Sequence, residues 1–441
     1  MTANEAQKSA ITHVNGPMLV LAGPGSGKTF VITERIRYLI YDAHIPPEHI
    51  LVITFTNAAA EQMKKRFQRL IGDEKVPVSF GTFHAVYFHI LQQNSHYCPR
   101  DILKQEDQYH YLREIIAEQK LDVMYPKEWM NELLSQISCL KNDMPPRTTD
   151  EYLDCVYPCY MKKCRDAGKL DFDDMLSMCL ELLQAREDIL QKCREQYQYI
   201  LIDEFQDINP VQYKIIKLLA APRKHLFIVG DDDQSIYGFR GARPEIMLGF
   251  EKEFRGCKRV VLETNYRSTT EIVRLSLKLI RHNKRRFKKH LTAFKGSGGR
   301  VFVKQYDNIE QELAAIKAEI QKLQKTSSYR DMAILYRTNL GEKLLQKTFA
   351  YEMKQGLVLS TIHGAKGLEY EIVFIIDIIA GNIPHRKAKK KSEVEEERRL
   401  FYVAITRAKQ NVYLLSVRKH LEKQVEVSRF MKEIKHPMRR W

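Results

Sequence analysis

Residues 18–29 read Met-Leu-Val-Leu-Ala-Gly-Pro-Gly-Ser-Gly-Lys-Thr, and this stretch decides the fold. The apolar run 18–21 predicts a buried strand, and residues 31–40 predict an amphipathic helix. Strand, glycine-rich loop and helix in this order are the context of a Walker A phosphate loop. Ala22 replaces the first glycine of the strict pattern, but the flanking elements favour phosphate binding over a glycine-rich turn without a ligand.

The loop supplies groups suited to a nucleotide triphosphate. Its glycines let the backbone bring N–H groups against phosphate, and the helix N-terminus adds its positive dipole end. Lys28 can reach the β- and γ-phosphates, and the Thr29 hydroxyl can hold Mg²⁺. The other candidate nucleotide ligands in this loop are Gly23, Gly25, Ser26 and Gly27.

Composition places the chain among multidomain proteins with a polyanionic partner. Its 441 residues allow two to four domains, and 44% hydrophobic content is enough for buried cores. The formal net charge is +16, from 71 basic and 55 acidic residues. Nucleic acid is the first candidate partner, with solubility alone as the alternative.

No signal sequence or membrane span is expected. The N-terminus is polar, and no apolar run approaches the ~20 residues that a membrane span needs. We therefore expect a cytoplasmic protein without a membrane partner. The spacing of Cys155, Cys159 and Cys164 on a predicted helix favours reduced thiols over an iron–sulfur cluster.

Alternating strands and helices predict an α/β fold with parallel sheets. Strands are expected at 18–21, 50–55, 76–80, 199–202 and 225–229, and again at 301–304, 332–336, 358–361, 372–376 and 412–415. Residues 87–169 have helical periodicity, and sheet character is expected to return through 170–176 and the helix that belongs to it. The predicted domains are a first core (1–86 and 170–259), an inserted helical subdomain (87–169) and a second core (260–441).

A second chemical motif follows the apolar strand 199–202. Asp203 is placed to coordinate Mg²⁺, and Glu204 beside it can act as general base toward water. The pair favours hydrolysis over phosphoryl transfer to a substrate. Gln7, upstream of the phosphate loop, can read adenine through its amide, and Gln234 can sense the γ-phosphate.

Several residues suit nucleic-acid contact. Tyr237 and Phe239 can stack on bases. Phe55 and His84 lie at predicted strand ends, where functional groups gather, although a core role for Phe55 is equally open. The basic stretch 281–289 is either a phosphate-contacting face or a solvated one, and we favour contact.

Eight motifs in order resemble the UvrD/Rep/PcrA family of superfamily 1 DNA helicases. They are AGPGSGKT, TFTN, GTFH, DEFQD, GDDDQSIY, NYRS, HGAKGLE and VAITRA. The resemblance implies two RecA-like P-loop cores with ATP between them and single-stranded DNA across their top. The cofactors would be ATP and Mg²⁺, and the partners single-stranded DNA and single-strand/duplex junctions.

The resemblance also implies roles for individual residues. Gln7 would read adenine, Tyr266 would stack on it, and Glu369 would contact ribose. Arg267 and Arg407 would contact the γ-phosphate, joining Lys28, Asp203, Glu204 and Gln234 in catalysis. The implied DNA contacts are Phe55, Thr56, His84, Tyr237, Phe239 and His363.

Three departures from the family pattern stand out. Phe30 replaces an arginine beside the base, so adenine stacking there is expected to be aromatic. Phe239 replaces a tryptophan. Only residues 349–356 stand where family members insert a second helical subdomain, and eight residues are too few for a domain. We also expect no attached nuclease domain.

The predicted function is an ATP-dependent single-stranded DNA translocase or helicase, 3′→5′ by resemblance and typical of DNA repair. Two alternatives stay open. One is a motor subunit of a larger repair or defence complex, in which a protein partner supplies regulation or nuclease activity. The other is a DNA-structure-binding protein whose ATPase only switches affinity. RNA also stays open as the polymer, since stacking reads any base.

Overall fold

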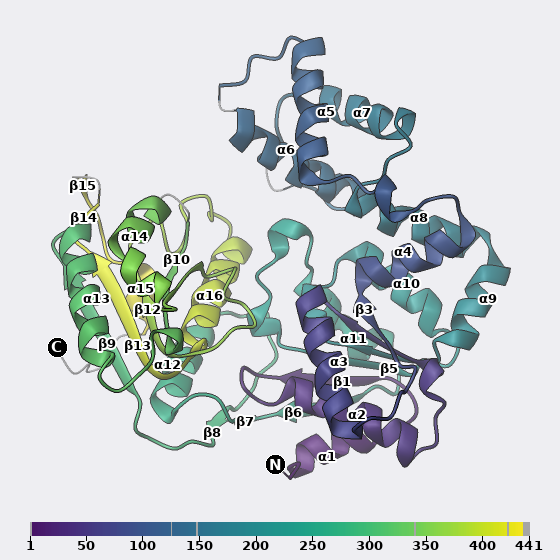
Figure 1. Cartoon of the computed structure of the whole chain (residues 1–441), viewed down its shortest axis with the longest axis horizontal. Helices are drawn as coiled ribbons and strands as arrows, with labels where there is room; N and C mark the ends of the chain where they lie inside the picture. The colour runs from purple at the N-terminus through teal and green to yellow at the C-terminus, as the bar shows by residue number, and fades with distance from the viewer. Residues whose placement is uncertain (1, 125, 147–148, 339–340, 421–422, 435–441) are drawn as a thin grey trace. The chain divides into compact units, whose positions relative to one another are not determined.

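The structure is a computed structural model that describes residues 2–124, 126–146, 149–338, 341–420 and 423–434 (Figure 1). The chain divides into two compact units. The first comprises Met1–Leu21, Lys28–Gly230 and Tyr237–Val260, and the second comprises Ala22–Gly27, Asp231–Ile236 and Val261–Trp441. Each unit has its own sheet, as the predicted α/β fold with two RecA-like cores requires.

A six-stranded sheet in the order β3-β2-β4-β5-β1-β6 organises the first unit. The pairs β2–β3, β2–β4, β4–β5 and β1–β5 are parallel. Parallel strands covered on both faces are apolar throughout, and β1, β2, β4 and β5 are buried at every position. The strands are β1 (Met18–Ala22), β2 (Ile50–Thr54), β3 (Ser79–Thr82), β4 (Tyr199–Ile202), β5 (Leu226–Gly230) and β6 (Lys258–Leu262), and the helices outside the insertion are α1 (Glu5–Thr12), α2 (Lys28–Tyr41), α3 (Asn57–Ile71), α4 (Phe83–Asn94), α8 (Phe172–Ala185), α9 (Glu187–Gln196), α10 (Pro210–Ala220) and α11 (Pro244–Glu253).

Three helices in the first unit form a separate group with its own apolar core (Figure 1). They are α5 (Gln105–Glu118), α6 (Pro126–Lys141) and α7 (Leu153–Asp166). Their core includes Leu112, Leu133 and Val156, all fully buried. The predicted limits of the helical insertion, 87 and 169, stay a prediction.

Two local predictions were wrong. Strand β3 begins at Ser79 and not at residue 76, because Pro77 has no N–H to donate to a neighbouring strand. The segment 170–176 is helical from Phe172. Its start is set by Asp171, whose side chain accepts from the N–H groups of Asp173 and Asp174 in a capping box.

The second unit contains a parallel five-stranded sheet in the order β11-β10-β12-β13-β9. Alternate residues along its strands face two apolar clusters. One cluster receives side chains from α12 and α16, and the other from α13, α14 and α15. The elements are β7 (Thr264–Asn265), α12 (Thr270–Ile280), β8 (Thr292–Ala293), β9 (Arg300–Tyr306), α13 (Ile309–Leu323), β10 (Met332–Tyr336), α14 (Glu342–Thr348), α15 (Ala350–Lys354), β11 (Val358–Thr361), β12 (Tyr370–Ile375), α16 (Lys391–Ile405), β13 (Ala408–Val417), β14 (Lys419–His420), β15 (Lys423–Gln424) and α17 (Arg429–Glu433).

Between β10 and β11 the described residues form only the short helices α14 and α15, where the resemblance implies a larger insertion. Among the helices of the described ranges, none combines the length and apolar character needed to cross a membrane.

Candidate functional site

The phosphate loop connects β1 to α2, and Gly25 is a position in it where both the backbone conformation and the space disfavour a side chain. Gly25 has φ +67°, and a Cβ there would lie 2.4 Å from Cβ of Arg267. The Gly25 carbonyl accepts a hydrogen bond of 2.8 Å from the N–H of Tyr266. Within the loop, the Ser26 hydroxyl donates to the carbonyl of Gly23 at 2.8 Å. These contacts hold the loop in a compact form beside the Tyr266–Arg267 backbone.

In the first unit, the predicted phosphate lysine and the predicted base are paired with each other. The Lys28 Nζ lies 2.7 Å from Oε1 of Glu204. Glu204 follows β4 with φ +51°, a conformation that costs energy for a non-glycine residue and is typical of functional sites. Its N–H donates to Oδ1 of Asp203 at 2.9 Å, and its second carboxylate oxygen accepts from Gln206. The fold therefore brings Lys28, Asp203 and Glu204 together.

Thr29 and Asp203 are the candidate Mg²⁺ ligands. Thr29 is the second residue of α2, and Asp203 follows the last residue of β4. Hydroxyl and carboxylate oxygens are the ligands that Mg²⁺ prefers, and the ion usually takes few protein ligands beside substrate phosphates. The donor set fits this ion.

The predicted adenine reader lies in the first turn of α1. Gln7 is 3% exposed and forms a capping box with Asn4. Its amide oxygen accepts the Asn4 N–H at 3.1 Å, and its own N–H donates to the Asn4 side chain at 2.8 Å. Phe30 lies half-buried in the first turn of α2.

In the second unit, Gln234 and Arg407 contact each other. Arg407 is 1% exposed, and its guanidinium donates to Oε1 of Gln234 at 3.1 Å. The Gln234 amide donates in turn to Asp231 at 2.8 Å. The helix α16 ends at Ile405 and its C-cap is Thr406, so Arg407 lies in the tight link to β13.

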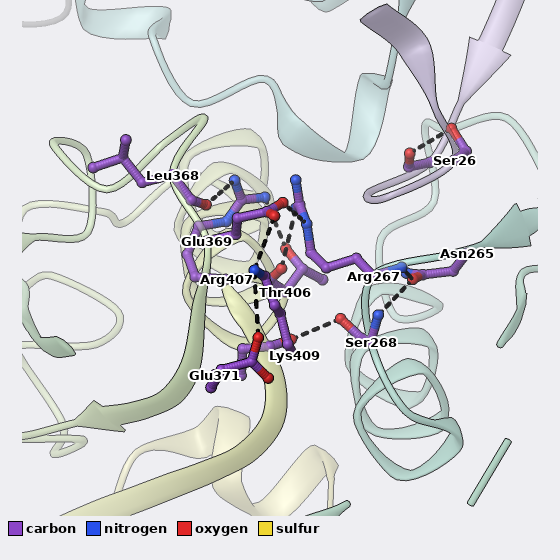
Figure 2. Close-up of polar contacts among 12 residues, drawn as sticks. Ser26, Asn265, Arg267, Ser268, Leu368, Glu369, Glu371, Thr406, Arg407 and Lys409 are labelled. Atoms are coloured by element: carbon purple, nitrogen blue, oxygen red, sulfur yellow. Dashed lines mark hydrogen bonds and ion pairs between the residues drawn. The ribbon is translucent and has the colours of Figure 1, made fainter. Parts of the chain in front are cut away.

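Arg267 and Glu369 form an ion pair with Nε and Oε2 2.6 Å apart, shown in Figure 2. Lys409 contacts the other Glu369 oxygen at 3.1 Å. Although burial favours the neutral acid, Arg267 and Lys409 hold the pKa of Glu369 below its usual value. The residues that the resemblance assigns to γ-phosphate and ribose thus contact each other in this structure.

An exposed aromatic residue that sequence reasoning missed lies beside Tyr266. The rings of Tyr266 and Phe294 have centroids 5.1 Å apart, and Phe294 is 68% exposed. The strand pair β7–β8 brings them together, since Asn265 is in register with Ala293. Only exposure distinguishes Phe294 from a core residue, and sequence does not report exposure.

Part of the basic stretch 281–289 is neither solvated nor available to DNA. Lys289 is buried, and its Nζ lies 2.5 Å from carboxylate oxygens of Asp231 and Asp232 and 2.8 Å from Asp233. Arg286 forms two hydrogen bonds to Asp233. Burial alone would lower the pKa of Lys289, but the three carboxylates raise it above the usual value. An ammonium group thus occupies what would otherwise resemble a metal site.

The predicted base-stacking residues of the first unit form one aromatic group. Phe55 and Tyr237 are stacked with centroids 5.7 Å apart, and Phe239 contacts Tyr237 edge-on at 6.0 Å. The Arg240 guanidinium lies 5.5 Å from the ring centres of both Tyr237 and Phe239. Phe239 is 38% exposed, so this group offers a ring and a cation to a ligand.

His84 contacts Phe172, a second aromatic residue missed from sequence. Their ring centroids are 5.4 Å apart, and Phe172 is 54% exposed. Burial lowers the pKa of His84 to about 4, so its ring is neutral at pH 7. In the second unit, burial, assisted by Arg337, likewise lowers the pKa of His363 to about 4. Neither histidine is a cationic phosphate contact at neutral pH.

Thr56 has a structural role at a helix end. Its hydroxyl accepts the N–H of Ala59 at 3.1 Å and caps α3. This bond satisfies one of the N–H groups that a helix start leaves without a partner. Capping does not conflict with a role in DNA contact.

Several known proteins resemble this chain. YjcD of Bacillus subtilis (strain 168) is 38% identical over 373 residues, which are 80% of this chain and 49% of YjcD. The ATP-dependent DNA helicase PcrA of Staphylococcus aureus (strain Mu50) is 35% identical over 377 residues, which are 82% of this chain and 51% of PcrA. PcrA of Staphylococcus epidermidis is also 35% identical over 377 residues. The chain spans about half the length of these curated relatives.

Two sequence profiles together match most of the chain. The UvrD/REP helicase N-terminal domain matches residues 3–255. The UvrD-like helicase C-terminal domain matches residues 260–355 and 350–419. With the two parallel sheets and the motifs at their strand ends, these matches show that the chain belongs to the UvrD/REP helicase family.

Proposed function

We propose that this protein is an ATP-driven motor on single-stranded DNA, acting as a translocase or helicase. The observation that carries the proposal is the Lys28–Glu204 pair, with Asp203 beside it at the carboxyl end of β4. A phosphate-binding lysine, a metal-binding carboxylate and a second carboxylate for water are the parts that nucleotide hydrolysis needs. Membership of the helicase family supports DNA as the polymer.

For hydrolysis, the proposed roles follow the positions of the side chains. Lys28 would leave Glu204 and bind phosphate, and Glu204 would then accept a proton from the attacking water. Thr29 and Asp203 would hold Mg²⁺, which neutralises charge on the phosphates. Gln234, Arg267 and Arg407 are proposed to stabilise the γ-phosphate.

For DNA, the proposed contacts are the aromatic residues. Phe55, Tyr237 and Phe239 form a group with an exposed ring at Phe239. Aromatic faces bind bases without regard to sequence, which suits movement along a strand. His84 and His363, neutral at pH 7, would contribute ring faces or neutral hydrogen bonds.

The test is the ATPase rate with no polymer, single-stranded DNA, duplex DNA and RNA. We expect single-stranded DNA to stimulate hydrolysis most, and Lys28→Ala to abolish the stimulated rate while DNA binding remains measurable. A rate that no polymer changes would refute the motor, and preferential stimulation by RNA would refute the choice of DNA.

Strand-displacement and translocation assays separate the remaining possibilities. We expect ATP-dependent 3′→5′ movement by the monomer on single strands, with weak unwinding of duplex. Movement only with an added partner would instead favour a motor subunit of a larger complex. ATPase activity without any movement would favour a DNA-structure-binding protein with an affinity switch.

A further inference from the structure

Arg35 is a buried arginine in α2 that contacts no carboxylate among the described residues. Its side chain is 2% exposed, and its guanidinium carbon lies 4.3 Å from the centre of the Phe227 ring. One guanidinium nitrogen, Nη1, donates to the carbonyl oxygens of Ala10 and Ile11 at 3.3 Å each, and to that of His13. The usual partner of a buried arginine is thus replaced by backbone carbonyls and an aromatic face.

These three carbonyls mark the end of α1. The helix ends at Thr12, and His13 is its C-cap. The last carbonyls of a helix lack partners within it and carry the negative end of the helix dipole, so a cation there is stabilised. Burial lowers the pKa of Arg35 to about 9, which leaves the group charged at pH 7.

The α1 helix is short, so contacts with the rest of the unit have to stabilise it. It has eight residues, and isolated helices of that length are marginal in water. A buried charge without a carboxylate partner is costly, and a well-packed apolar residue would cost less. This cost argues for a positional role of Arg35 beyond stability.

The opposite end of α1 carries Gln7 in its first turn, held in the capping box with Asn4. Arg35 itself belongs to α2, the helix that begins with Lys28 and Thr29. One guanidinium group therefore links the helix with the proposed adenine reader to the helix that begins with the proposed phosphate and Mg²⁺ ligands. Both helices lie in the first unit.

We propose that Arg35 is a positioning residue for base recognition, which sets the place of Gln7 relative to the phosphate-binding helix. This inference rests on the proposed role of Gln7 as adenine reader. Without Arg35, α1 would shift on α2, and ATP would lose its advantage over GTP while triphosphate binding persists. A residue that only stabilised the fold would change both affinities together.

The test measures the affinities of the native protein and of the Arg35→Met, Gln7→Ala and double variants for ATP and for GTP. Each nucleotide displaces a fluorescent ADP analogue from the protein. We expect Arg35→Met to lower the ratio of ATP to GTP affinity about tenfold, the worth of one well-placed hydrogen bond. Gln7→Ala should lower it similarly, and the double variant no further, because both act on one contact. Arg37→Met is the matched control on the same helix, since Arg37 is 40% exposed and pairs with Glu34.

Each outcome decides the proposal. If Arg35→Met keeps the native ratio of ATP to GTP affinity while Gln7→Ala lowers it, the role of Arg35 alone is overturned. If Gln7→Ala keeps the native ratio, the adenine reader is overturned and this inference with it. If the double variant loses as much as the two single variants together, Arg35 and Gln7 act independently and the inference is also overturned. If Arg35→Met does not fold, Arg35→Lys is tested instead. Its shorter side chain should lower the ratio about threefold, since a partly kept hydrogen bond is worth less than a whole one, and an unchanged ratio would overturn the inference.

Discussion

Replacing Glu204 with glutamine should stop ATP hydrolysis and at the same time tighten ATP binding. In the structure, Lys28 Nζ lies 2.7 Å from the Glu204 carboxylate, with side chains 15% and 25% exposed. At an effective dielectric constant of about 20, such a pair attracts by about 6 kcal/mol before the cost of desolvation. After the cost of desolvation is subtracted, a hydrogen bond to a charged group contributes about 1.5–3 kcal/mol.

ATP has to compete with Glu204 for Lys28, so part of this energy opposes binding. A glutamine still accepts a weak hydrogen bond, and we therefore take the lower value, about 1.5 kcal/mol, which corresponds to roughly tenfold tighter ATP binding. Hydrolysis should cease because an amide cannot accept the proton of the attacking water. Titration with a fluorescent ATP analogue measures the affinity, and single-turnover hydrolysis measures the rate.

Glu251→Gln is a suitable control, because Glu251 forms an exposed ion pair with Arg259 at 2.9 Å in the same unit. It should leave both ATP affinity and hydrolysis unchanged. If Glu204→Gln binds ATP no more tightly than the native protein, Glu204 does not compete for Lys28 and the reasoning fails.

Three further predictions address other parts of the site. Arg267→Ala and Arg407→Ala should each slow single-turnover hydrolysis strongly, towards the ~10³–10⁵ that arginine fingers contribute in other enzymes; normal hydrolysis by either variant would show that its arginine is misassigned. Phe239→Ala should weaken single-strand binding in a fluorescence titration by about 1–3 kcal/mol, and unchanged affinity would assign Phe239 a packing role. Glu312→Gln should raise the melting temperature more at pH 8 than at pH 5. Burial and Asp377 raise the pKa of Glu312 in the folded protein, so the native protein loses stability as the pH rises above the pKa of this carboxyl group in the unfolded chain. A stabilisation independent of pH would contradict that cause.

The sequence is sufficient to predict a feature that only neighbouring residues determine. The phosphate loop and the Asp203–Glu204 pair are each specified by an apolar run followed by a few polar residues, and the structure has both at strand ends. The start of α8 was equally local, since Asp171 and Asp174 form a capping box. The prediction of sheet character at 170–176 is wrong because this cap starts a helix at Phe172.

The sequence is insufficient to predict the role of a side chain when that role depends on partners far away in the chain or on exposure to solvent. Arg286 and Lys289 read as part of a basic face, yet their carboxylate partners lie more than fifty residues earlier. Phe172 and Phe294 differ from buried phenylalanines only by exposure. These outcomes depend on which loops the fold brings together, which no local pattern encodes.

The buried Asp231–Asp233 cluster changes which cations of this protein are available to DNA. The basic stretch 281–289 includes Arg286 and Lys289, but both are neutralised internally by these carboxylates. The salt dependence of DNA binding reports only the cations that replace counterions on phosphates. A measured salt slope will therefore correspond to fewer charges than the basic stretch contains. Because buried pairs are screened far less than exposed ones, salt that releases DNA should leave the Asp231–Asp233 turn intact.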